Sequence, residues 1–318
     1  MPITTPEELR QHLALAMQVE LTTVPPYLYA MYSIEDQTSE AARLIKSVVA
    51  EEMLHAALAA NLLVAVGGKP AFRDPALMPT YPGLLPHHVP PLMVNLAPAS
   101  PELIREVFMV IEMPEAPGAP PEDDQFETLG QFYYALELAF EDLSDRFDLF
   151  ADIQADRQLA DSGFYQPVEF DAEDSGGLML VDGLESACEA IEVVVHQGEG
   201  VTDERYADPS HQELTHFYKF EQIADGVSPL GEVRSAMMNP ATADLPAPLQ
   251  PVSDLVNALY RYLYLTMDDL YQPVADKGDL VGRLYTLMSR LLGPAIRYLM
   301  EQPVGGGLVA GPSFEVYV

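Results

Sequence analysis

The stretch KSVVAEEMLHAALAANLLVAVGG, residues 46–68, decides the fold. Its apolar residues recur every three or four positions, which predicts an amphipathic helix from about residue 39 to 66. The helix is expected to stop at the two glycines that end the stretch. Glu52 and His55 stand inside the apolar stripe, and a buried carboxylate normally needs a cation, a metal or a proton as its partner. These two residues are therefore the first candidates for a functional site.

The preceding segment, LRQHLALAMQVELTTVPPYLYAMYSI at residues 9–34, shows the same kind of pattern. A threonine cap, an early proline and two glutamates predict a helix from about residue 5 to 32. Glu20 lies on its apolar line, so a second carboxylate is expected to face the core. Pro25-Pro26 should make this helix kink or restart.

The remaining sequence predicts an all-α chain of one domain, residues 1–318, built on a four-helix bundle with extra helices. No internal repeat and no convincing strand order is found. The region from Gly67 to Pro101 is proline-rich and predicts a long loop that covers or lines something. The tail GGGLVAGPSF is expected to be irregular, and residues 160–181 are expected to be irregular or to hold a short hairpin. The other expected helices are a short one at about 102–113, an amphipathic stretch at 128–159, bundle helices at 183–199 and 209–224, and a C-terminal pair at 252–302.

The composition limits the partners of the chain. There are 16 Lys+Arg and 49 Asp+Glu in 318 residues, a net charge of −33 that repels nucleic acid and anionic membranes. Cys188 is the only cysteine, so neither an internal disulfide nor a cysteine-rich metal motif is possible. No secretion signal is recognised, and the longest apolar run is shorter than the ~20 residues of a membrane span. A soluble, cytoplasmic protein is expected, and the sequence is compatible with an oligomer.

Two Glu-x-x-His motifs point to a metal centre. The first is Glu52 with His55, and the second is Glu213 with His216, ahead of further aromatic residues. Two such motifs, together with one glutamate from each of two other helices, form the ligand set of carboxylate-bridged dimetal bundles. Oxygen and imidazole ligands suit iron, manganese or zinc. The alternative is a pair of buried, hydrogen-bonded histidines without a metal.

Glu20 can supply one of the two remaining carboxylates, and the other is expected from the helix between the motifs. In that helix, Glu199 stands between two glycines, where the backbone can approach a ligand closely, and it is preferred to Glu192. Glu137 and Glu141 are further options, although an acidic outer face explains them better. Glu112 ends a short apolar helix and is interpreted as a buried salt-bridge partner.

Several of these segments resemble one known family. The chain is similar to the ferritin-like family that includes the iminophenyl-pyruvate dimer synthase domain of violacein- and rebeccamycin-type pathways. The paired segments VELTTVPPYL and EEMLHAALAANLL carry the most specific part of the resemblance, which extends over most of the chain. The other similar pieces are IEMPE, VVVHQGEG, ELTHFYKFEQI and LYRYLYLTM.

The resemblance implies a ferritin-like bundle with two metal ions, iron in the first place. Carried over by position, it assigns six metal ligands: Glu20, Glu52, His55, Glu199, Glu213 and His216. Glu52 and Glu213 would bridge the ions, and Glu20 and Glu199 would be terminal ligands.

The expected function is an oxidase or oxygenase that uses dioxygen or peroxide on a small organic substrate, in secondary metabolism. A ferritin-like protein that binds or handles iron without organic turnover is the alternative. A metal-free bundle serving as a partner subunit is a third hypothesis.

Overall fold

The computed structural model of the chain describes residues 3–116, 118–161, 163–168, 176–198, 214–274 and 276–316. Helices dominate these residues, and the four strands assigned among them are only two or three residues long. The prediction of an all-α fold is confirmed.

The principal helices are α1 (Pro6–Ser33), α2 (Glu40–Ala65), α5 (Leu129–Arg146), α6 (Leu184–Gly198), α8 (His216–Ala224), α9 (Gln250–Leu270), α10 (Lys277–Thr286) and α11 (Gly293–Met300). Two helices contain a π-helical segment. One consists of α3 (Pro101–Leu103), the π-helical η2 (Ile104–Phe108) and α4 (Met109–Ile111), and in the other the π-helical η5 (Leu287–Leu292) joins α10 to α11. The short 3₁₀ turns are η1 (Pro75–Leu77), η3 (Ala155–Arg157) and η4 (Thr242–Asp244). The strands pair as two antiparallel hairpins, β1 (Gly83–Leu84) with β2 (Met93–Val94) and β3 (Pro303–Gly305) with β4 (Leu308–Val309).

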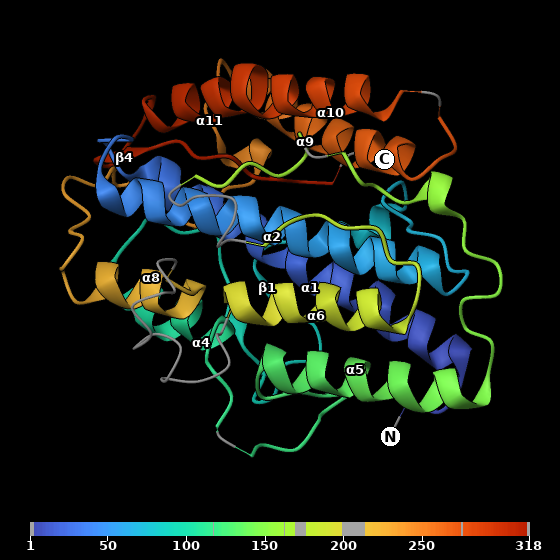
Figure 1. Cartoon of the computed structure of the whole chain (residues 1–318). Coiled ribbons are helices and arrows are strands. Elements are labelled where there is room, and N and C mark those ends of the chain that lie inside the picture. Colours follow the sequence, from blue (N-terminus) through green and yellow to red (C-terminus); the bar gives the residue numbers. More distant parts are fainter. Residues whose placement is uncertain are drawn as a thin grey trace.

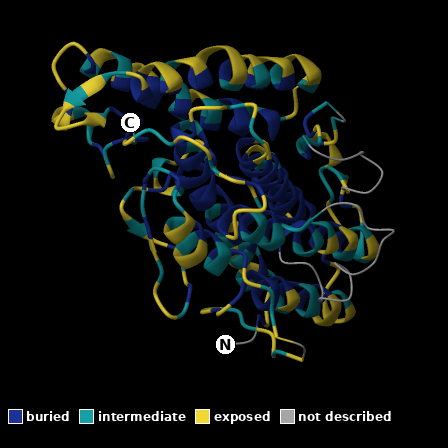
Figure 2. Cartoon of the chain, turned by 90° about the vertical axis from the view of Figure 1, so that its left-hand side faces the viewer, coloured by how far each residue is buried: buried dark blue, intermediate teal, exposed yellow. Residues whose placement is uncertain are grey.

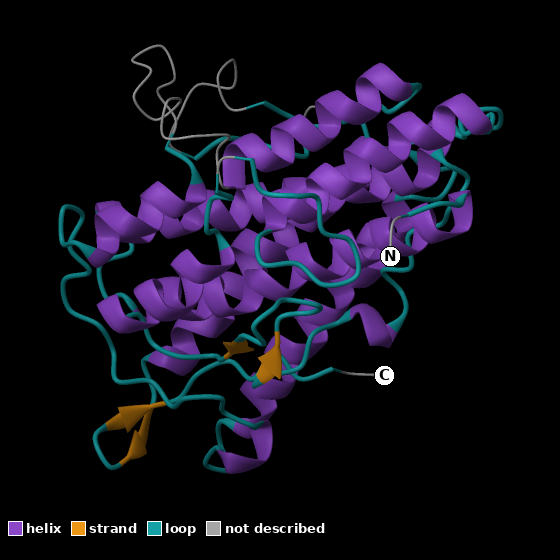
Figure 3. Cartoon of the chain, turned by 90° about the horizontal axis from the view of Figure 1, so that it is seen from below, coloured by secondary structure: helices purple, strands orange, loops and turns teal. Residues whose placement is uncertain are grey.

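The helices form three layers around α1 and α2, which pack together along most of their length (Figure 1). The helices α9, α10 and α11 cover one side of this central pair, and α4, α5, α6 and α8 cover the other (Figure 1). The central helices are almost wholly buried, whereas the outer helices expose one face (Figure 2). Seen from below, most long helices run in a similar direction, and the strands lie outside the bundle (Figure 3). Polar residues on the inner faces of α1 and α2 are therefore shielded from water.

The helix α1 continues through Pro25 and Pro26 to its last residue, so it does not restart there. Pro26 has no amide hydrogen, which leaves the carbonyl of Thr22 without its helical donor. The hydroxyl of Tyr81 donates to this carbonyl at 2.6 Å instead. Because Tyr81 belongs to the proline-rich loop, the same hydrogen bond holds that loop against α1.

The two central helices have the ends that their sequences predict. In α1, Thr5 accepts a hydrogen bond from the amide of Glu8, whose side chain accepts from the amide of Thr5 in return. In α2, the hydroxyl of Ser39 caps the first turn, and Gly67 follows the helix with a φ of 77°. The helix α2 is long and apolar enough to cross a membrane, but most of it is buried inside the protein, as in a core helix.

Outside the central pair, three expectations differ from the structure. The helix expected over 209–224 begins at His216, because Thr215 before it has an extended backbone, and residues 209–213 lie outside the described part of the chain. The stretch expected to be helical over 128–159 ends at Arg146, because three aspartates at 148, 152 and 156 favour turns over helix. The C-terminal tail was expected to be irregular, but it contains β4, which pairs with β3. Three consecutive glycines with φ angles of 99°, 62° and 81° form the turn between the two strands. The described part of residues 160–181 is irregular, as expected, and contains no hairpin.

Candidate metal centre

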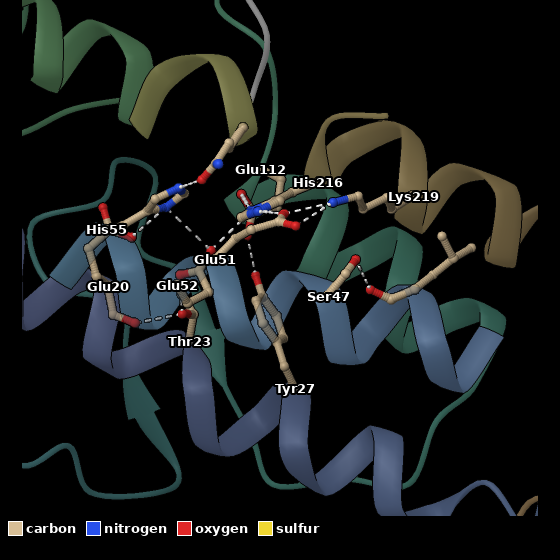
Figure 4. Close-up of polar contacts among 12 residues, drawn as sticks. Glu20, Thr23, Tyr27, Ser47, Glu51, Glu52, His55, Glu112, His216 and Lys219 are labelled. Atoms are coloured by element: carbon tan, nitrogen blue, oxygen red, sulfur yellow. Dashed lines mark hydrogen bonds and ion pairs between the residues drawn. The ribbon is translucent and has the colours of Figure 1, made fainter. Parts of the chain in front are cut away.

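Five buried residues from four helical segments meet on one side of the central pair (Figure 4). Glu20 comes from α1, Glu52 and His55 come from α2, and His216 begins α8. Glu112 immediately follows α4. Each of the five is at most 2% exposed. Burial of so many ionisable groups demands partners of opposite charge.

The five residues form two groups of three that share Glu52. In the first group, His55 Nδ1 lies 3.5 Å from Glu20 Oε2 and 3.9 Å from Glu52 Oε1. In the second, His216 Nδ1 lies 3.0 Å from Glu52 Oε1 and 3.2 Å from Glu112 Oε2. The potential ligand atoms of each group lie within 4.8 Å of one another. Each group could hold one metal ion, and Glu52 is placed to bridge two.

Each of the three carboxylates, Glu20, Glu52 and Glu112, accepts a hydrogen bond from a hydroxyl group. The hydrogen bonds run from Tyr133 Oη to Glu20 Oε1 (2.5 Å), from Thr23 Oγ1 to Glu52 Oε2 (2.5 Å) and from Tyr27 Oη to Glu112 Oε1 (2.6 Å). Burial, reinforced by the carboxylate next to each ring, raises the pKa of Tyr27 and of Tyr133 well above the ordinary value. Both phenols are therefore neutral donors that fix the orientation of the carboxylates they contact.

The outer nitrogen of each histidine is also occupied. His55 Nε2 lies 2.9 Å from the amide oxygen of Gln197 on α6, and His216 Nε2 lies 2.8 Å from Glu51 Oε2. An oxygen acceptor at Nε2 favours a hydrogen on that nitrogen, so Nδ1 is the nitrogen that faces the carboxylates and that a metal ion would bind after displacing its proton. The two rings are nearly parallel, with centroids 5.3 Å apart. Both histidines are thus oriented as Nδ1 ligands.

Glu51 joins the centre to a buried lysine. The ammonium of Lys219 on α8, which is fully buried, lies 2.9 and 2.6 Å from the two carboxylate oxygens of Glu51. Burial alone would raise the pKa of Glu51, but the charge of Lys219 and the contact with His216 lower it to about 2. Glu51 is therefore ionised and neutralised by its own lysine, and it acts on the centre through His216.

The charge of the centre fits a metal cation. Burial raises the pKa of Glu52 to about 7, and the neighbouring Glu112 and Glu20 add to this effect. Burial would lower the pKa of His216, but Glu112 and the other carboxylates outweigh it and raise that pKa well above the usual value. In the metal-free protein, protons on Glu52 and His216 therefore offset the negative charge of the carboxylates. Carboxylate oxygens and imidazole nitrogens are the donors that iron, manganese and zinc accept.

The structure brings together four of the six residues predicted as ligands: Glu20, Glu52, His55 and His216. Glu199 and Glu213 lie outside the described residues. Glu192, the alternative to Glu199, lies on the outer face of α6, where its carboxylate pairs with His196 at 3.3 Å and remains 59% exposed. It points outward because Ala187, Ala190, Ile191 and Val194 form the buried face of that helix.

Glu112 is the third carboxylate of the centre among the described residues. Its interpretation as a buried ion-pair partner was incomplete, because Glu52 and Glu112 share His216 in one potential metal site. The signal in the sequence was a glutamate on the apolar face of a short helix, four residues after Phe108. Glu51 and Lys219 were missed, because adjacent glutamates suggest that one faces solvent and a lysine normally does.

A small cavity adjoins the described part of the centre. It has a volume of about 10 Å³ and lies against the ligands, between the start of α5 and the end of α6. Gly130, Val195 and Gly198 contribute to its wall, and a Cβ on Gly198 would lie 3.8 Å from Glu112 Oε2. This volume suffices for one water molecule or a comparably small species.

The fold and this centre define a helical-bundle protein with a buried carboxylate–histidine site. Residues 13–225 match the family model described as Ferritin-like, and the chain belongs to this family. A crystal structure of a ferritin like protein from Caulobacter vibrioides is similar, with a TM-score of 0.73 and 23% identity over 99% of this chain and 100% of that chain. This likeness shows the fold alone. A search of curated proteins gives no match. The narrower resemblance to the iminophenyl-pyruvate dimer synthase type stays a prediction.

Proposed function

We propose that the chain is a dimetal oxidase or oxygenase that holds two iron ions and acts on a small organic molecule. The observation that carries this proposal is the pair of buried ligand groups that share Glu52. Two divalent ions would bring four positive charges to the three carboxylates of these groups, which explains why so many acids lie in a region closed to water. The proposed surroundings are cytoplasmic, without nucleic acid or membrane partners.

The residues of the chain would perform separate tasks in this centre. Glu20 with His55 and Glu112 with His216 would each hold one ion, and Glu52 would fix the spacing between the two ions. The bound iron would supply the redox chemistry with dioxygen. The hydroxyl donors behind the carboxylates would keep the oxygen ligands in place. The resemblance to a synthase family that couples oxidised imines supports the choice of an organic substrate.

Elemental analysis of the purified protein tests this proposal. Wild-type protein grown with iron and manganese should contain about two metal ions per chain, because two ligand groups are present. The double variant His55→Ala/His216→Ala should contain none. His196→Ala is the matched control, because His196 lies on α6 and pairs with Glu192 outside the centre. Unchanged metal content in the double variant would contradict the assignment.

Metal binding is expected to release protons. In the metal-free protein the pKa of His216 lies well above its usual value and that of Glu52 lies at about 7, so both hold protons that a metal ion must displace. Zinc titration of the metal-free protein in weak buffer at pH 7 should release roughly one to two protons per chain. The affinity should fall as the pH is lowered from 7.5 to about 5.5, since protonation of Glu52 and His216 then competes more strongly. A pH-independent affinity without proton release would contradict this.

A second candidate is a ferritin-like protein that binds or oxidises iron without turning over an organic molecule, and membership of the Ferritin-like family supports it. The cavity of about 10 Å³ beside the described part of the centre has room for a species the size of a water molecule. Oxygen consumption distinguishes the two candidates. The storage-type protein should consume oxygen only in proportion to added ferrous iron, whereas the oxidase should continue to consume it when a suitable organic substrate and reductant are supplied.

A further inference from the structure

A second cavity lies on the opposite side of the central helices. Its volume is about 110 Å³, and it is enclosed by α1, α2 and the C-terminal helices α9, α10, η5 and α11. On α2, Met53 and Ala56 line this cavity, although each directly follows a residue of the metal centre, Glu52 or His55. Successive residues of an α-helix point about 100° apart, so the same helices present one face to each site. The two sites lie back to back and have no lining residue in common.

The lining of the cavity is almost entirely apolar. Aliphatic, aromatic and thioether side chains form its walls, and no charged residue is among them. An apolar cavity of about 150 Å³ stays dry and accepts benzene, so a volume of this order suits a single six-membered ring. Met53, Met267 and Met288 contribute to the walls, and methionine adapts readily to the shape of a bound molecule. The volume therefore corresponds to a monocyclic ligand.

Three of the residues that line this cavity are tyrosines, and their hydroxyls are the polar side-chain groups among the lining residues. The hydroxyls of Tyr260 and Tyr264 lie 3.0 Å apart, and burial raises the pKa of both, so both stay neutral. Tyr32 enters from α1, and a Cβ on Gly293 would come within 2.5 Å of its hydroxyl oxygen. A glycine at the junction between η5 and α11 thus leaves the space that this hydroxyl occupies. Neutral hydroxyls can both donate and accept, and they suit one uncharged polar group on a ligand.

The geometry points to a metal-independent binding site for a small monocyclic molecule that carries one hydroxyl group, of which phenol is the simplest example. The π-helical segment η5 contributes to the lining, and such segments often occur at functional sites. This inference goes beyond the proposed function, because it requires neither the metal ions nor their ligands. The negative charge of the chain does not oppose an uncharged ligand of this kind.

Binding of phenol and benzene, measured by calorimetry or by ligand-observed NMR, tests the inference. Wild-type protein should bind phenol with a dissociation constant of roughly 1 mM or lower, a value in the range for seven heavy atoms. The metal-free protein should bind it equally well. Leu263→Trp, which fills the cavity from α9, should weaken binding by about tenfold or more while leaving the metal content unchanged. Leu255→Trp is the matched control, because Leu255 is 51% exposed on the same helix and should have no effect.

The hydroxyl groups are tested separately. Tyr32→Phe and Tyr264→Phe should each weaken phenol binding about fivefold, with benzene binding unchanged. Equal phenol affinity in wild type and in both tyrosine variants would overturn the assigned ligand class. Absence of saturable phenol binding to the wild type, or equal binding by Leu263→Trp, would overturn the site itself. Because metal content is measured on the same samples, failure here is distinguishable from failure of the metal proposal.

Discussion

Replacement of Glu52 by alanine is expected to abolish the binding of both metal ions. Glu52 is the residue that belongs to both ligand groups, so its removal leaves each group with one carboxylate and one histidine. Elemental analysis should find about two ions per chain in the wild type and fewer than about 0.2 in Glu52→Ala. Since burial and the neighbouring acids raise the pKa of Glu52, its ionised form is unfavourable in the metal-free protein. The metal-free variant should therefore remain folded at pH 7.5, which circular dichroism can establish.

Two single variants provide the comparison for Glu52→Ala. Glu20→Ala and Glu112→Ala each remove a carboxylate from one group, so each should lower the content to about one ion per chain. Retention of one ion by Glu52→Ala would show that Glu52 does not bridge. Loss of both ions in all three variants would show that the two groups load only together, and it would contradict the assignment of an independent ion to each group.

Replacement of Lys219 by methionine is expected to cause a large loss of stability. The variant leaves the carboxylate of Glu51, which is 1% exposed, without its ammonium partner. Removal of one partner from a buried ion pair costs about 3–5 kcal/mol in the free energy of unfolding. Urea denaturation of the metal-free proteins at pH 7.5 measures this difference. The double variant Lys219→Met/Glu51→Gln removes both charges and should regain a large part of the loss.

The stability that Lys219 confers should also depend on pH. The pKa of Glu51 in the folded protein is about 2, below the ordinary carboxyl value, so the pair stabilises the fold above the unfolded pKa. This contribution is lost as the pH falls toward 2 and Glu51 becomes protonated. The difference in unfolding free energy between wild type and Lys219→Met should therefore shrink at acidic pH. A difference that stays constant between pH 7.5 and about 3 would exclude Glu51 as the group responsible.

The sequence predicts the helical fold well because the central helices carry strong local signals. The caps of α1 and α2 and their apolar spacing depend on residues within a few positions of one another, so each helix is specified locally. The end of α5 at Arg146 was less predictable, since apolar residues continue beyond it. The small hairpins were missed because two paired residues leave almost no alternating pattern to detect.

The residues that meet in the candidate centre could be predicted where they follow helical spacing and were missed where they do not. Glu52 and His55 stand three residues apart in a regular helix, so their common face can be calculated from the sequence. Glu112 comes after a π-helical segment, so its direction relative to the residues before that segment does not follow the ordinary spacing. The pairing of Glu51 with Lys219 joins residues 168 positions apart, and no local pattern contains that information.

The π-helical turn η2 also constrains how this chain can change. Such a turn holds one residue more than an α-helical turn, so everything after it is rotated by about 100° relative to an uninterrupted helix. If this segment were a regular α-helix, Ile111 would point toward Glu52 in place of Glu112. An apolar side chain would then replace a carboxylate in the centre. Deletion of the one extra residue of the turn would restore regular winding and leave the acid facing Glu52, whereas loss of the turn without a deletion would turn the acid away. In related chains, loss of the π-helical turn and loss of one residue from this segment must therefore occur together if the acid is to keep its direction.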